Sequence, residues 1–165
     1  MIILGIDPGT TAIGFAVLKS GRPPRLLDAG LIPITTAGTA ERLVELHRGL
    51  SRLIATAKPD AAAVEKLFFA KNTKTAMAVA EARGAILLTA ALARVSVYEY
   101  APVEIKKIVT GDGAADKKAV QKMVMLTLPE TAGLRARDDV FDAIAAALAC
   151  YFTEFSKYHS TRSKL

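Results

Sequence analysis

The apolar run Ile2–Ile6, which leads directly into Asp7, Pro8 and Gly9, constrains the fold more than any other segment. A short apolar run without polar alternation is typical of a central strand covered on both faces, and Pro-Gly predicts a turn after it. Asp7 then lies at the carboxyl end of a central strand, where open α/β sheets usually carry out their chemistry. No basic region precedes the run, so we interpret it as a strand and not as a signal peptide.

The remaining elements predict an α/β fold. Strand-like segments at Ile13–Leu18 and Leu26–Ile34 are joined to the first by short turns, which indicates an antiparallel three-strand meander. Beyond them we expect helices over Thr39–Ala57, Thr73–Ala93, Pro102–Val109, Asp116–Leu128 and Asp138–Phe155, and strands over Ala61–Glu65 and Val95–Tyr100. This order predicts a five-stranded mixed sheet flanked by helices. We expect residues 1–155 to form a single domain and residues 156–165 a short, basic, flexible tail.

Composition narrows the class of protein. The chain has 22 Lys and Arg against 16 Asp and Glu, a net charge of +6, which by itself only weakly indicates an anionic partner. No apolar run approaches the roughly 18 residues that a membrane helix needs, so we expect no contact with a membrane. The single cysteine, Cys150, lies in an Ala-rich run and is expected to be a buried core residue. One cysteine cannot form an intramolecular disulfide, which favours a cytoplasmic location.

Carboxylates recur at positions that are unfavourable for a charge. Glu65 ends an apolar strand as Asp7 does, and a buried charge there is costly unless it is paired or bound to metal. In the last helix, Asp142 is three residues after Asp139 and four after Asp138, so either acid can share its side. One of the pair can instead be the helix N-cap, and spacing alone does not choose between them.

Carboxylates without His or Cys favour the hard ions Mg²⁺ or Mn²⁺. Two such ions about 4 Å apart can activate a water molecule and stabilise the leaving oxygen in phosphodiester hydrolysis. The basic segments of the chain would hold a polyanionic substrate against this negative site. The sequence therefore predicts a metal-dependent nuclease.

Four segments resemble, in order, motifs of the RuvC-type Holliday junction resolvases of the ribonuclease H-like superfamily. They are ILGIDPGTTAIGFAVL, VEKLFFAKNTKTAMAVAEARG, VYEYAPVEIKKIVTGDGAADKKAVQKMV and DDVFDAIAAALA. The resemblance runs from residue 1 to about residue 152 and implies a ribonuclease H-like fold. It also implies which acids are catalytic and bind metal: Asp7, Glu65, Asp142 and, in preference to Asp138, Asp139.

The family's activity is the resolution of four-way DNA junctions by paired symmetric nicks in homologous recombination and DNA repair. By resemblance we expect two Mg²⁺ per active site, with Mn²⁺ able to substitute, a homodimer, and a partnership with a branch-migration motor complex. The helix after the glutamate would contribute to the dimer, with Met77, Ala80 and Ile86 on its face or packed on the sheet. Expected DNA contacts are Phe68, Lys71, Lys106, Lys117 and Lys118.

The chain departs from the family pattern in one loop. Where relatives often read G-N-G-R, this chain has Gly111, Asp112, Gly113 and Ala114, so we expect a weaker grip on DNA there. In some relatives the first helix acid, which is Asp139 here, is a histidine.

Three alternatives stay open at this point. The segment Asp7-Pro8-Gly9-Thr10-Thr11 also resembles the phosphate loop of the sugar kinase, actin and Hsp70 superfamily, but 165 residues cannot supply the two domains that such proteins need. A nuclease of the same fold could act on RNA–DNA hybrids or single strands. A catalytically inactive junction-binding module would gain nothing from acids gathered where DNA must lie.

Overall fold

The computed structural model describes residues 1–66, 73–134 and 137–155, and its centre is a five-stranded mixed sheet of order β3-β2-β1-β4-β5. The strands are β1 (Ile2–Asp7), β2 (Ala12–Lys19), β3 (Arg25–Pro33), β4 (Ala61–Glu65) and β5 (Ser96–Tyr100). The first three form an antiparallel meander, while β4 pairs in parallel with β1 and with β5. The predicted α/β class and five-stranded mixed sheet are confirmed.

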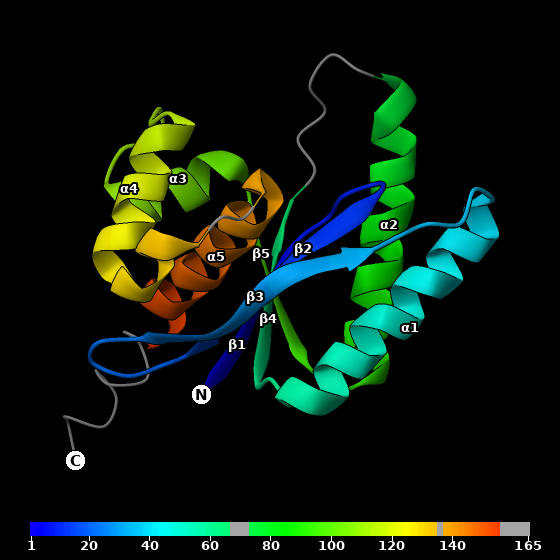
Figure 1. Ribbon diagram of the computed structural model, residues 1–165, viewed down its shortest axis with the longest axis horizontal. Coiled ribbons are helices and arrows are strands. Elements are labelled where there is room, and N and C mark those ends of the chain that lie inside the picture. Colours follow the sequence, from blue (N-terminus) through cyan, green and yellow to red (C-terminus); the bar gives the residue numbers. More distant parts are fainter. Residues whose placement is uncertain (67–72, 135–136, 156–165) are drawn as a thin grey trace.

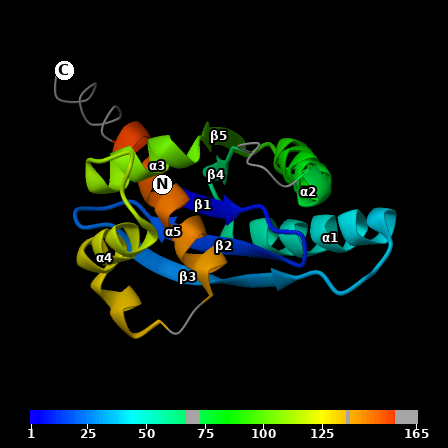
Figure 2. The ribbon, with the colours of Figure 1, turned by 90° about the horizontal axis from the view of Figure 1, so that it is seen from above.

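Helices cover both faces of the sheet (Figures 1 and 2). On one face lie α1 (Thr39–Ala57) and α2 (Thr73–Leu92); on the other lie α3 (Pro102–Thr110), α4 (Lys117–Thr127) and α5 (Asp138–Cys150). Strand β1 contributes to both apolar cores, with Leu4 and Ile6 in the α1/α2 core and Ile3 in the α5 core. Its unbroken apolar run is therefore buried on both faces, as predicted.

Most predicted element boundaries agree with the structure to within one or two residues, and the differences lie near the C-terminus. The last predicted helix ends as an α-helix at Cys150 and continues as a π-helical segment, η2 (Tyr151–Phe155). A short 3₁₀ helix, η1 (Pro129–Gly133), was not predicted because a single turn leaves no apolar periodicity to detect. Cys150 is a buried free thiol, as expected. No helix in the described part of the chain is both long and apolar enough to cross a membrane.

Candidate active site

Two of the predicted acids lie side by side at one edge of the sheet. Strands β1 and β4 are parallel neighbours with Ile6 opposite Val64, and the next residue of each strand is its terminal acid, Asp7 or Glu65. Both acids are half-buried. Neither is in an ion pair within the described ranges. The fold therefore holds two partly desolvated carboxylates together, and neither has a paired cation among the residues that the structure describes.

Helix α5 brings two further acids to this edge because glycines let it lie directly on the sheet. A Cβ atom at Gly14 would lie 2.0 Å from the carbonyl oxygen of Asp139, and one at Gly5 would lie 2.0 Å from that of Ala143. Such distances are shorter than any real contact, so only glycine fits at these positions. The N-terminal part of α5, which carries Asp139 and Asp142, thus packs against β1 and β2.

The electrostatics of Asp7 and Glu65 depend on the acids of α5. Burial raises the pKa of Asp7 to about 7, and repulsion by Glu65, Asp142 and Asp139 acts in the same direction, while Lys117 opposes it. The pKa of Glu65 is also raised to about 7, first by burial and then by Asp142. Loss of hydration disfavours the charged form of a carboxyl group, and neighbouring negative charge disfavours it further. A bound cation would relieve both penalties.

Asp138 and Asp139 differ in what they face. Asp139 is among the charges that act on Asp7 and lies 3.3 Å from the Arg137 guanidinium. Asp138 is 65% exposed and faces α4, with its carboxylate 3.4 Å from Lys117 Nζ and 3.4 Å from Gln121 Nε2. The geometry thus places Asp139 on the side of the acid cluster and Asp138 on the side of α4.

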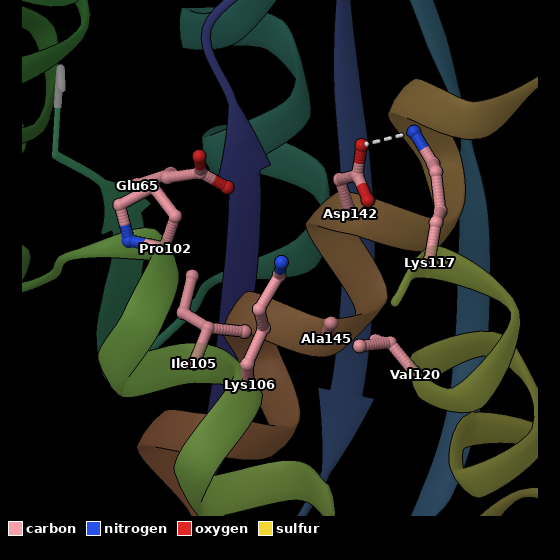
Figure 3. Close-up of a pocket in the computed structure, with 8 residues that line it drawn as sticks. All are labelled: Glu65, Pro102, Ile105, Lys106, Lys117, Val120, Asp142 and Ala145. Carbon is pink, nitrogen blue, oxygen red and sulfur yellow. Dashed lines mark hydrogen bonds and ion pairs between the residues drawn. The ribbon is translucent and has the colours of Figure 1, made fainter. Parts of the chain in front are cut away.

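A pocket of about 240 Å³ opens between β4, α3, α4 and α5 beside these acids (Figure 3). Glu65 and Asp142 lie on opposite sides of it, and Lys106 points up between them from α3. Lys117 Nζ donates a hydrogen bond to Asp142 Oδ2 at 2.9 Å. The remaining lining residues are Pro102, Ile105, Val120 and Ala145. The pocket therefore combines two acids and two lysines above an apolar floor.

The residues predicted to contact DNA are distributed unevenly. Lys106 and Lys117 line the pocket, whereas Lys118 is exposed and lies outside its lining. The Asp116 carboxylate caps α4 by accepting from the Ala119 amide at 2.8 Å, which fixes Lys117 in the first turn. Phe68 and Lys71 lie outside the described residues.

In the loop that departs from the family pattern, the acid Asp112 has a local structural role. Asp112 Oδ1 accepts a hydrogen bond from the Ala114 amide at 2.8 Å. Gly111 caps α3 with a positive φ of 85°, a conformation that favours glycine. Asp112 therefore shapes the turn, and the expected effect on DNA binding stays a prediction.

The donor set fits a hard divalent cation in chemistry. All four clustered acids offer carboxylate oxygens, which Mg²⁺ and Mn²⁺ prefer. Across the described ranges, however, no three acidic, His or Cys side chains already converge as a metal cage. Asp142 instead accepts a hydrogen bond from Lys117 Nζ.

Three positioning residues were not identified from the sequence. Gly5 and Gly14 allow the close approach of α5, and glycines inside strand patterns are the signal that could have revealed this. Arg42 of α1 donates from Nη2 to the Thr10 carbonyl, in the turn that follows Asp7. No local sequence pattern predicts that contact, because 32 residues separate its partners.

Comparison with known proteins agrees with this geometry. The family described as Crossover junction endodeoxyribonuclease RuvC matches residues 3–150. The Crossover junction endodeoxyribonuclease RuvC of Chloroflexus aggregans is 46% identical over 156 residues, covering 93% of this chain and 94% of the relative.

Solved structures share the fold. Thermus thermophilus RuvC in complex with a Holliday junction substrate superposes with a TM-score of 0.85 at 32% identity, covering 97% of each chain. The yeast mitochondrial Holliday junction resolvase Ydc2, at 12% identity and a TM-score of 0.65, covers 98% of this chain and 85% of its own, and shares the fold alone. With a match over most of its length and close curated relatives, this chain belongs to the RuvC family of crossover junction endodeoxyribonucleases.

Proposed function

We propose that this chain resolves four-way DNA junctions by paired, symmetric phosphodiester hydrolysis in homologous recombination and DNA repair. One observation carries the proposal: Asp7, Glu65, Asp139 and Asp142 gather at the ends of β1 and β4 in a member of this nuclease family. The proposal is also supported by the T. thermophilus relative, which is described in complex with a Holliday junction substrate.

The four acids would hold two Mg²⁺ ions per active site, with Mn²⁺ able to replace them. Such ions polarise the phosphate and lower the pKa of a water molecule, the chemistry that hydrolysis needs. The raised pKa values of Asp7 and Glu65, each about 7, support this assignment because ionising both acids without a cation is unfavourable. These acids would bind the ions in their ionised forms.

The lysines and the pocket floor act on the substrate. Lys106 and Lys117 present ammonium groups at the pocket mouth, where they would bind phosphates next to the scissile bond. Lys118, Lys71 and Phe68 would contribute further contacts with the DNA, with Phe68 stacking on an unpaired base at the junction centre. Ile105 and Val120 line the pocket with apolar side chains.

Paired cleavage requires two active sites, so we propose a homodimer. Helix α2 has two sides: Ala82, Ile86 and Ala90 are buried against the sheet, whereas Met77 and Leu88 are 68% and 60% exposed. Ile86 therefore belongs to the core and not to a dimer face. An apolar groove at Leu88, shared with Val44 of α1, supports self-association through this side. Leu88→Lys should shift the dimer towards monomer in sedimentation velocity.

The cellular setting is part of the same proposal. A junction resolvase acts where DNA branches migrate, so we propose a branch-migration motor complex as partner and the cytoplasm as location. The only cysteine, Cys150, is buried and free, which is consistent with a reducing compartment.

The test compares three substrates at equal concentration with Mg²⁺: a mobile four-way junction, a linear DNA duplex and an RNA–DNA hybrid. We expect nicks in the junction at symmetric positions on two strands of like polarity. Preferential cleavage of the hybrid would indicate a nuclease that acts on RNA–DNA hybrids and would refute junction resolution. Equal cleavage of the duplex would refute structure selectivity.

A further inference from the structure

Lys117 occupies a distinctive place in the acidic site. Its Nζ lies 2.9 Å from Asp142 Oδ2 and 3.4 Å from Asp138 Oδ2, so a single ammonium group bridges two acids of α5 (Figure 3 shows the contact with Asp142). The Asp116 cap sets the start of α4 and thereby fixes the backbone of Lys117 at this position. The contact therefore joins α4 to α5 through one ammonium group.

Lys106 provides an internal comparison. It lines the same pocket and lowers the pKa of Glu65 by its charge. Among the ion pairs of the described residues, however, it has none, whereas Lys117 has two. Both lysines contribute positive charge to the site, but only Lys117 covers carboxylate oxygens that a metal ion needs.

We propose that Lys117 is the resident cation of the metal-free site, and that it yields Asp142 to an incoming divalent ion while remaining bound to Asp138. This inference rests on the proposed function, since it requires a divalent ion at Asp142. It gives Asp138, the acid on the α4 side of α5, the role of a positioning residue.

Asp138 is suited to this role by its surroundings. Its other carboxylate oxygen accepts from Gln121 Nε2 at 3.4 Å, which ties it to α4 one turn after Lys117. Asp138 is not among the charges that act on Asp7, so Lys117 can stay paired with Asp138 when Asp142 turns to a metal ion. After the exchange the ammonium group stays at the pocket mouth, free of Asp142 and available to a phosphate.

The exchange predicts how two mutations depend on each other. In EDTA, Lys117 divides its charge between two acids; with Mn²⁺ present it pairs with Asp138 alone. A double-mutant cycle of Lys117→Met and Asp138→Asn, read by thermal unfolding, should give a coupling of about 1–3 °C with Mn²⁺. The coupling in EDTA should be smaller. A coupling that is unchanged or reduced by Mn²⁺ would overturn the role of Asp138.

The decisive experiment is a calorimetric titration of the full chain with Mn²⁺, without DNA, at pH 8. We expect Lys117→Met to bind Mn²⁺ about threefold to tenfold more tightly than the wild type, because the competing cation is gone. Lys106→Met removes an equal charge from the same pocket and should tighten binding about twofold or less. An equal gain in both variants would overturn the exchange and leave the metal site intact. A wild-type protein that binds no Mn²⁺ would overturn the metal site itself and the exchange with it.

Discussion

The acids at the strand ends and the acids of α5 are in opposite electrostatic conditions. Asp7 and Glu65 are half-buried, have no paired cation among the described residues, and have pKa values raised to about 7. Asp139 and Asp142 are about one-third exposed and are already paired, with Arg137 and Lys117 respectively. The sheet therefore provides carboxylates in need of a cation, and the helix provides carboxylates that must first release one.

The difference follows from how each pair is positioned. Backbone pairing of parallel strands fixes Asp7 and Glu65 at one edge without any contribution from their side chains. The positions of the α5 acids depend instead on the close packing of the helix over glycines of β1 and β2 and on the cations beside them. We infer that the strand acids define where a metal ion binds, and that the helix acids respond to its arrival.

The largest expected effect comes from removing a strand acid. Asp7→Asn should reduce junction cleavage by on the order of 10³-fold or more, because it removes a proposed metal ligand. Junction binding should be retained or tightened, since one negative charge near the phosphates is lost. Gel-shift and cleavage assays on the same preparation measure both. Undiminished cleavage would refute the assignment of Asp7.

The two adjacent helix acids should differ in effect. Asp139→Asn should slow cleavage by about 100-fold, because Asp139 belongs to the cluster around Asp7. Asp138→Asn should change the rate only a few-fold, because Asp138 faces α4. Single-turnover rates with saturating Mg²⁺ provide the comparison. If Asp138→Asn proved the more damaging change, the side of α5 that faces the metal site would be wrongly assigned.

Moving α5 away from the strands should lower the stability of the protein and weaken its binding of metal ions. A Cβ atom at Gly14 would meet the Asp139 carbonyl at 2.0 Å, so Gly14→Ala must displace the first turn of α5. We expect a loss of about 1–3 kcal/mol in the free energy of unfolding, together with weaker Mn²⁺ binding. Gly133→Ala is the matched control, because its Cβ would meet nothing within 4 Å. Equal stability of the two variants in urea titrations would contradict the close approach.

The smallest effect concerns pH. The folded pKa values of about 7 exceed the ordinary values of 3.8 and 4.5, so the folded state retains protons that the unfolded chain has released. The metal-free protein should therefore lose stability as pH rises from about 4 to 7. In EDTA, the melting temperature should fall between pH 5 and pH 8 in both proteins. The fall should be smaller in Asp7→Asn than in the wild type, by on the order of 5 °C. If the melting temperatures of wild type and variant changed equally with pH, ionisation of Asp7 would not destabilise the folded protein.

Much of the fold was predictable because its signals are local. The apolar runs Ile2–Ile6 and Ala61–Glu65, the turns between the first strands and the helical periodicity of α1 each act over a few residues. The same locality placed Asp7 and Glu65 at strand ends. Resemblance to the family then favoured Asp139 over Asp138, a choice that spacing left open.

The remainder depends on contacts between distant segments. Whether Lys117 faces a phosphate or an acid is decided by the packing of α4 on α5, 25 residues away. The need for glycine at position 14 arises only once α5 lies on β2. Such contacts leave no periodic signal in the sequence, so the state of the helix acids required the structure.

The central claim is that the strand-end carboxylates Asp7 and Glu65 form the metal site that drives junction cleavage. The most direct test binds the protein to a mobile four-way junction in EDTA and then adds excess Mg²⁺. We predict no cleavage before the addition, paired symmetric nicks after it, and no nicks at any time with Asp7→Asn. Cleavage in EDTA, or nicking by Asp7→Asn at the wild-type rate, would contradict the claim.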